Sequence, residues 1–357
     1  MLASLFKIQP GEGNKVLLFG LLAGLLEFGL ALGLTAGDSL FLHHIGADRL
    51  SVIYFASPVI MLLYTLAYSW LIRVFGLVTT FKLTLGILVV GGVLIWFGVD
   101  RWVHGSPNPH EGLLYAVKFY GVVWTIALFT LLWGFIDTYF ELQDAKRLFP
   151  LFAAAASFGA MLGGAAAFSL SGLIPIETFF LMWAFVSLIA LPLLHRIHKT
   201  HRALSLEDDP AEETDTGIGA ALLQLARTVM GSRYALVLGL MLFISMFTAT
   251  LMEYQSLSIF SADRDEQALA SLIGSMYGFA NLFNLVFTLF LFNRLILAIG
   301  VRNTALILPV CQIAVFFYFL IDYGFAAAIC GFVVFHGVMV SIAENNNNLL
   351  FNGLPSS

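Results

Sequence analysis

Long apolar blocks dominate this chain of 357 residues. Stretches such as 16–36, 51–72, 81–99 and 112–135 each hold about 20 residues, enough for an α-helix to cross roughly 30 Å of hydrocarbon. Because lipid offers the backbone no hydrogen-bond partners, such blocks must be helical. Of all residues, 60% are hydrophobic and only 11% are charged, against roughly 25% charged in soluble domains. The sequence therefore predicts an all-α polytopic membrane protein.

The loops between the blocks set the orientation. Most of the 17 Lys and Arg residues fall in alternate loops. The positive-inside rule places these loops, and the N-terminus, in the cytoplasm. The predicted helices number about ten and span roughly 16–36, 51–72, 81–99, 112–135, 150–172, 174–194, 233–256, 268–292, 303–321 and 323–343.

A polar segment divides the chain into two similar parts. Residues 195–232 form a predicted cytoplasmic linker with an amphipathic helix on the membrane surface. In the flanking parts, 1–194 and 233–357, the second helix ends LIRVFG and LFNRLILAIG, and the third ends WFGVD and YFLID. Two six-helix halves joined by a cytoplasmic loop are the layout of the major facilitator superfamily. We therefore predict a major-facilitator-like fold.

The final residues, ENNNNLLFNGLPSS, align with DTYFELQDAKRLFP of the first half. The first half continues from that point for two more predicted helices. We therefore expect a twelve-helix architecture in which helices eleven and twelve are missing, with a possible soluble domain beyond Ser357. The alternative is a ten-helix protein with a short polar tail.

Four ionisable side chains stand out inside predicted helices, where charge is costly and usually functional. They are Glu27, Lys118, Glu253 and His336, on the first, fourth, seventh and tenth helices. In a facilitator these helices line the central cavity. We expect the four residues to bind substrate or couple its movement, with a Glu27–Lys118 ion pair that substrate breaks. The alternatives are a static pair, a solvated Glu253 and a hydrogen-bonded His336.

Other polar residues are weaker candidates. Asn281, Asn284 and Gln255 can contact substrate, or they can bond helices together. The spacing of His195, His198 and His201 suggests a metal site less well than a basic patch facing lipid headgroups. The two cysteines lie inside predicted helices, so neither a disulfide nor a metal framework is expected. The residues expected to form a cytoplasmic gate are Arg73, Asp144, Lys146, Arg147, Arg294 and Arg302.

The fifth predicted helix reads FAAAASFGAMLGGAAA. Gly159, Gly163 and Gly164 follow the spacing of small residues that lets another helix approach closely. The pattern predicts a tight helix contact and says nothing about the direction of coupling.

The segment DAKRLFPLFAAAASFGAMLGG, residues 144–164, resembles the ATP/ADP translocase-type nucleotide transporters. The ending NNLLFNGLPSS is similar to the tenth-helix turn of their larger bacterial relatives. The resemblance implies a facilitator-like fold in the bacterial inner membrane and exchange of nucleotides, which need cationic ligands. The chain departs from this pattern, because Lys118 is the one Lys or Arg firmly within a predicted cavity helix.

The function expected from these features is secondary transport or exchange of an organic anion, with nucleotides favoured. Two alternatives stay open: translocation of lipids, and a non-transporting sensor or anchor for a C-terminal domain. No nucleophile–base pair or cofactor motif is evident in the sequence, so an enzyme, a cofactor and a nucleic-acid partner are not expected.

Overall fold

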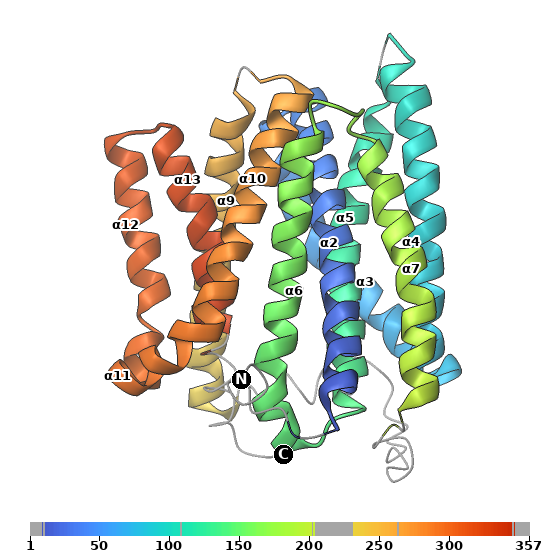
Figure 1. The fold of residues 1–357 in the computed structure, drawn as a ribbon. Helices are drawn as coiled ribbons and strands as arrows, with labels where there is room; N and C mark the ends of the chain where they lie inside the picture. Colours follow the sequence, from blue (N-terminus) through green and yellow to red (C-terminus); the bar gives the residue numbers. More distant parts are fainter. Residues whose placement is uncertain are drawn as a thin grey trace.

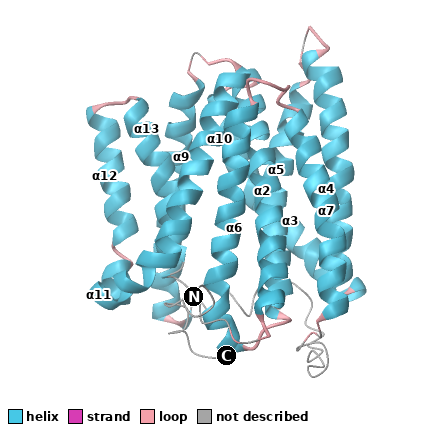
Figure 2. Ribbon diagram, in the orientation of Figure 1, coloured by secondary structure: helices cyan, strands magenta, loops and turns pink. Residues whose placement is uncertain are grey.

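The structure is a computed structural model, and it describes residues 11–107, 109–201, 231–262 and 264–344, together with Gln9, Ala203 and Asn346. Throughout these residues the regular elements are helices (Figure 2). The first group comprises α2 (Gly13–His44), η1 (Ala47–Arg49), α3 (Leu50–Phe75), α4 (Leu77–Val99), η2 (Asp100–His104), α5 (Glu111–Asp137), α6 (Leu142–Leu170) and α7 (Thr178–Thr200). The second comprises α9 (Arg233–Ser261), α10 (Glu266–Val286), η3 (Phe287–Leu291), α11 (Phe292–Thr304), α12 (Ile307–Ile321), α13 (Phe325–Val333) and η4 (Val334–Glu344).

Nine helical segments of this described part are long and apolar enough to cross a membrane, and Ile307–Ile321 is a shorter apolar helix of 15 residues. The prediction of an all-α, multi-pass membrane protein is therefore confirmed. The helices run alternately between two ends (Figure 1). We call the end with Lys15, Arg73 and Arg147 the basic end, and the end with His44 and Glu266 the distal end.

Several predicted helix boundaries differ from the structure, and two show the reason. The first helix continues beyond residue 36 to His44, and the sixth continues beyond 194 to Thr200. Apolar blocks mark only the part of a helix that lies in hydrocarbon, and α2 carries a polar last turn with His43 and His44. The predicted amphipathic helix and the asparagine-rich ending lie outside the described residues, Asn346 excepted.

Helix α6 lies between α2 and α10 (Figure 1), and its glycines allow both contacts. A Cβ atom on Gly159 would lie 2.0 Å from the carbonyl oxygen of Gly24, and one on Gly164 would lie 2.6 Å from that of Gly274. The backbones therefore touch directly on opposite sides of α6. The predicted close approach at Gly159, Gly163 and Gly164 is confirmed, and it involves two neighbouring helices.

The two groups of helices share an apolar core at the distal end. Phe41 and Ile53 from the first group are buried with Phe260, Ile273 and residues near them from the second. A separate core fills the first group from end to end, and another joins α9, α12, α13 and η4. The shared core attaches the groups to one another close to the end where α2 finishes and α10 begins.

We expect Gly159→Ala to lower the free energy of unfolding by about 1–3 kcal/mol, because the added methyl group overpacks the α2–α6 contact. The measurement is the thermal midpoint of the purified protein in detergent. Gly86→Ala is the matched control, since nothing lies within 4 Å of a Cβ at that position. Alanine favours the helix there, so this variant should be at least as stable as the native chain. Equal effects at both positions would contradict the close packing.

Candidate functional site

A buried ion pair lies between the first and fourth long helices. The Lys118 ammonium on α5 contacts Oδ1 of Asp38 on α2, and the two side chains are only 13% and 3% exposed. The other carboxylate oxygen, Oδ2, accepts a hydrogen bond of 3.1 Å from the hydroxyl of Tyr277 on α10. Both Asp38 oxygens are therefore satisfied, one from each group of helices.

The expected pair between Glu27 and Lys118 is not present in this structure. Glu27 lies 11 residues before Asp38 on α2, which is about 16 Å along a helix axis. Asp38 is level with Lys118, because α2 continues past the predicted end of the first helix. Glu27 has no hydrogen-bond or ion-pair partner among the described residues, is partly buried, and lies nearer the basic end.

A second acid–base contact lies in the other group of helices. His336 Nε2 on η4 is 3.4 Å from Oε1 of Glu253 on α9. The hydroxyl of Tyr54 on α3 donates to Glu253 Oε2 over 3.2 Å. Glu253 and His336 are 14% and 19% exposed at the side chain, so Glu253 is not the freely solvated group of the alternative interpretation.

The Asp38–Lys118 and Glu253–His336 contacts are built in the same way, with the roles of the two groups of helices exchanged. Each carboxylate meets a basic side chain of its own group of helices and a tyrosine hydroxyl of the other group. The first group contributes its first, second and fourth long helices, and the second group contributes the helices in the same order of position. We call these six residues the central cluster: Asp38, Tyr54, Lys118, Glu253, Tyr277 and His336.

The backbone around His336 is π-helical from Val334 to Glu344. Such wide turns often accompany functional sites, because they displace side chains and free backbone groups. Asn284 donates to the His336 carbonyl oxygen over 3.0 Å, which fixes η4 against α10. The imidazole is enclosed by aromatic rings, with centroids 4.2 Å from Phe332 and 4.9 Å from Tyr277.

The remaining uncharged candidates fall outside the central cluster. Asn281 donates to the carbonyl of Tyr277 one turn earlier on its own helix. Gln255 accepts from the hydroxyl of Tyr323, an exposed residue after α12. Asn284 binds two helices together, in agreement with the interhelical alternative.

At the basic end, charged groups fasten α2 to α6. The Arg147 guanidinium contacts Glu12, and it also donates to Oδ1 of Asp144 over 2.7 Å. Lys15 donates to the Tyr139 carbonyl over 2.6 Å, in the turn between α5 and α6. These contacts join α2, α6 and the turn between α5 and α6, all of which belong to the first group of helices.

Only two of the residues predicted to form a cytoplasmic gate contact one another among the described residues. Asp144 and Arg147 pair on α6, whereas Arg73, Arg294 and Arg302 are exposed and make no ion pair with another described residue. The side chain of Lys146 lies outside the described part.

The three histidines of the linker region do not converge. His198 Nδ1 lies 2.8 Å from the Tyr139 hydroxyl, and His195 Nδ1 lies 3.4 Å from Lys82 Nζ. No metal arrangement joins them within the described residues.

A scan against protein-family models gives no match to this chain, and a search of curated proteins gives none either. The functional interpretation consequently depends on the residues of the central cluster themselves.

We expect Asp38→Asn to lower the free energy of unfolding by about 3–5 kcal/mol, because it leaves the buried Lys118 ammonium without a counter-charge. The double variant Asp38→Asn, Lys118→Gln should recover much of the loss, since no charge is then unpaired. Thermal midpoints of the single and double variants measure this. Asp48→Asn, at an exposed position of η1, is the control. A double variant no more stable than Asp38→Asn would disprove the coupling.

The contact at the basic end predicts a pH dependence. Hydrogen bonding to Arg147 lowers the pKa of the Glu12 carboxyl below its ordinary value of 4.5, against the opposing effect of burial. A lowered folded-state pKa means that the stabilisation is complete above the unfolded-state pKa and is lost as the pH falls below it. Glu12→Gln should therefore lower the thermal midpoint at pH 7 more than at pH 4.

The matched test for this contact repeats Glu12→Gln in an Arg147→Gln background. The substitution should then have little effect at pH 7, because the partner of the carboxylate is gone. An unchanged effect would show that Glu12 acts through other groups, such as the backbone N–H of Gln9, which donates to its Oε2.

Proposed function

We propose that the protein is a secondary active transporter or exchanger of an organic anion, working by alternating access. The reciprocal composition of the central cluster carries this proposal. Among the described residues of the central cluster, each group of helices holds one acid–base contact of its own, and only two tyrosine hydroxyls link the charged side chains of one group to those of the other. Such links can break while each buried acid keeps its basic partner.

The repeated order of the contributing helices supports a two-part, facilitator-like layout. In this layout the distal end faces away from the cytoplasm, and the N-terminus is cytoplasmic. The apolar core shared at the distal end then closes the protein on that side. At the basic end, Arg73, Arg294 and Arg302 are exposed and form no ion pair with another described residue, which agrees with a site open toward the cytoplasm.

Lys118 is the proposed anion ligand. An incoming carboxylate or phosphate competes with Asp38 for its ammonium, replacing one charge-assisted hydrogen bond with another of the same kind. Protonation of Asp38 removes the competing charge. The cluster offers only Lys118 and His336 as cationic groups, so it suits substrates that place one or two charges there. Nucleotides, implied by the resemblance, are the first class to test.

Glu253 and His336 are the proposed coupling site. Histidine changes charge near neutral pH, and its partner carboxylate can accept the proton in turn. Tyr54, on the first group of helices, donates a hydrogen bond to Glu253. A change in the charge of Glu253 therefore changes the strength of this bond between the two groups. A proton taken up here changes the attraction between the two groups.

A second candidate function is lipid movement. An apolar cleft of about 450 Å³ lies between α2 and α6, and Phe28 and Phe158 are among its lining residues. Acyl chains suit such a cleft, although no charged group lines it. The transport experiment below separates this candidate from the first.

The decisive measurement is uptake into proteoliposomes of radiolabelled ADP and of smaller organic anions, with and without a pH gradient. We expect saturable uptake of at least one anion, reduced at least tenfold in Lys118→Ala because the substrate loses its ligand. The double variant Asp38→Asn, Lys118→Gln guards against misfolding, since it should fold and still fail to transport.

Arg49→Ala is the matched control, because this exposed arginine of η1 lies outside the central cluster. Its uptake should equal that of the native protein. Uptake that survives in Lys118→Ala would remove Lys118 from the mechanism. Movement of a fluorescent lipid between leaflets, without uptake of any anion, would favour the second candidate.

A further inference from the structure

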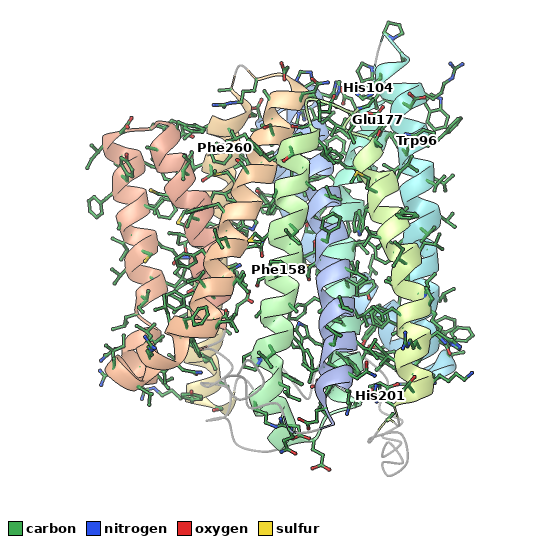
Figure 3. All side chains as sticks on the ribbon, viewed as in Figure 1. Trp96, His104, Phe158, Glu177, His201 and Phe260 are labelled. Atoms are coloured by element: carbon green, nitrogen blue, oxygen red, sulfur yellow. The ribbon has the colours of Figure 1, made fainter. Side chains whose placement is uncertain are left out.

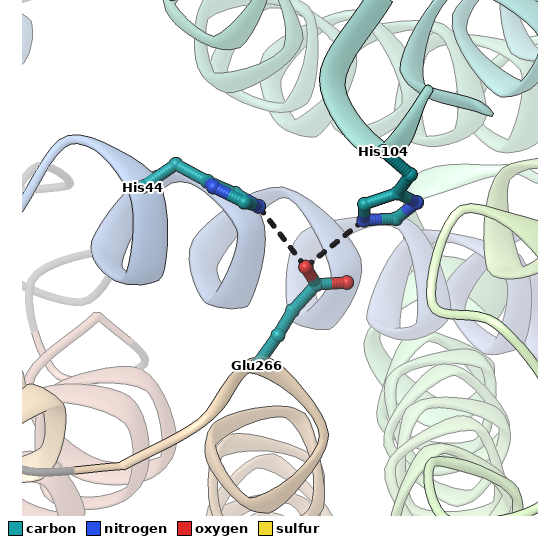
Figure 4. Close-up of side chains that lie close together, drawn as sticks. All are labelled: His44, His104 and Glu266. Carbon is teal, nitrogen blue, oxygen red and sulfur yellow. Dashed lines mark hydrogen bonds and ion pairs between the residues drawn. The ribbon is translucent and has the colours of Figure 1, made fainter. Parts of the chain in front are cut away.

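Two histidines and a glutamate converge at the distal end, where His44 lies six residues after Asp38, about 9 Å along α2. His44 Nε2 and His104 Nε2 each lie 3.1 Å from the same oxygen, Oε2 of Glu266 (Figure 4). One ligand atom from each residue lies within 4.8 Å of the others. The side chains are only 16%, 33% and 14% exposed, respectively. This site is separate from the residues proposed for transport.

The three side chains come from three elements. His44 ends α2, His104 ends η2, and Glu266 begins α10. The first two belong to the first group of helices and the third to the second group. A ligand held by all three therefore bridges the two groups at their distal end, directly beside the shared apolar core.

The dimensions suit a small, nitrogen-preferring cation. Zinc takes histidine and carboxylate ligands at about 2.0–2.2 Å in tetrahedral geometry, which places neighbouring ligand atoms roughly 3.3 Å apart. The two histidine–glutamate distances already have nearly that value. The ligand atoms of the two imidazoles lie within 4.8 Å of one another, so they would have to approach by no more than about 1.5 Å to reach the same spacing. Three protein ligands leave the fourth position for water or for substrate.

A buried carboxylate behind His104 provides an independent observation. His104 Nδ1 lies 3.3 Å from Oε2 of Glu177, whose side chain is 5% exposed. Glu177 immediately precedes α7, and it is labelled beside His104 in Figure 3. That oxygen is buried and accepts no hydrogen bond from any described residue. Metal-binding histidines commonly donate their second ring N–H to such a carboxylate, which orients the ring and makes it a better ligand.

We propose that His44, His104 and Glu266 bind one Zn²⁺ ion, with Glu177 orienting His104, and that the ion holds the distal end closed. Magnesium and calcium prefer oxygen ligands and higher coordination numbers, so they should not occupy this site. The predicted consequence is inhibition of transport by external zinc. Only this consequence rests on the proposed function; binding itself does not.

The first experiment measures binding of ZnCl₂ to the full chain, purified in detergent with a tag free of histidine. We expect one ion per chain in competition with a chromophoric chelator, and a rise in the thermal midpoint by mass action. MgCl₂ should give neither. X-ray absorption at the zinc edge should show two imidazoles in a nitrogen and oxygen shell.

Substitutions identify the ligands. His44→Gln, His104→Gln and Glu266→Gln should each weaken zinc binding at least tenfold, and Glu177→Gln should weaken it less. His43→Gln is the matched control, because this adjacent, exposed histidine faces the Arg264 carbonyl at 3.4 Å instead. His198→Gln controls for binding at the basic end. Both controls should bind zinc as the native chain does.

The outcomes separate the two proposals. Absence of zinc binding by the native chain, or binding lost in His198→Gln but kept in all three ligand variants, would overturn the site. Zinc binding that depends on His44 and Glu266, in a protein that transports no tested anion, would leave the site standing and refute the proposed function. Binding with unaffected transport would overturn the closing role of the ion.

Discussion

The structure depends on how a buried positive charge is kept in an apolar bundle. Lys118 has Asp38 as its counter-ion, and an ion pair out of water is tolerated only when its remaining hydrogen-bonding capacity is also satisfied. Tyr277 supplies that last bond from α10. The hydrogen-bonding capacity of Asp38, in one group of helices, is thus completed by a tyrosine of the other. The same hydrogen bond therefore holds the two groups together and keeps the buried ion pair in place.

Hydrophobic burial cannot bring helices together within lipid, because lipid chains are as apolar as the side chains they replace. Van der Waals packing, which includes close backbone contact, and polar bonds must do so. Helix α6 shows the first, with Gly159 against α2 and Gly164 against α10. The central cluster and the bond from Asn284 to η4 show the second. The apolar surface is left to face lipid, and many large apolar side chains are accordingly exposed.

The sequence identified the membrane helices, the glycine-mediated contact and three members of the central cluster. Lys118, Glu253 and His336 could be found because a charge inside an apolar run is rare. Asp38 was missed because Gly37, Asp38 and Ser39 make the stretch after residue 36 resemble a polar loop, and Glu27 was given its role. The chain has 11 tyrosines, and nothing in the sequence distinguishes Tyr54 and Tyr277 from the others. Partner choice depends on helix depth and rotation, which hydropathy does not specify.

The tyrosine links have a consequence for the electrical behaviour of the proposed rearrangement. Separating the two groups of helices at the central cluster breaks bonds from uncharged phenols, while the Asp38–Lys118 pair stays intact and neutral within its own group. Moving one elementary charge through the membrane field is worth about 2.3 kcal/mol per 100 mV. An ion pair with no net charge that moves as a unit changes its energy in the membrane field very little. If the proposed mechanism holds, the empty protein reorients with little influence from the membrane potential, and voltage acts mainly through the charge that the substrate or a proton brings.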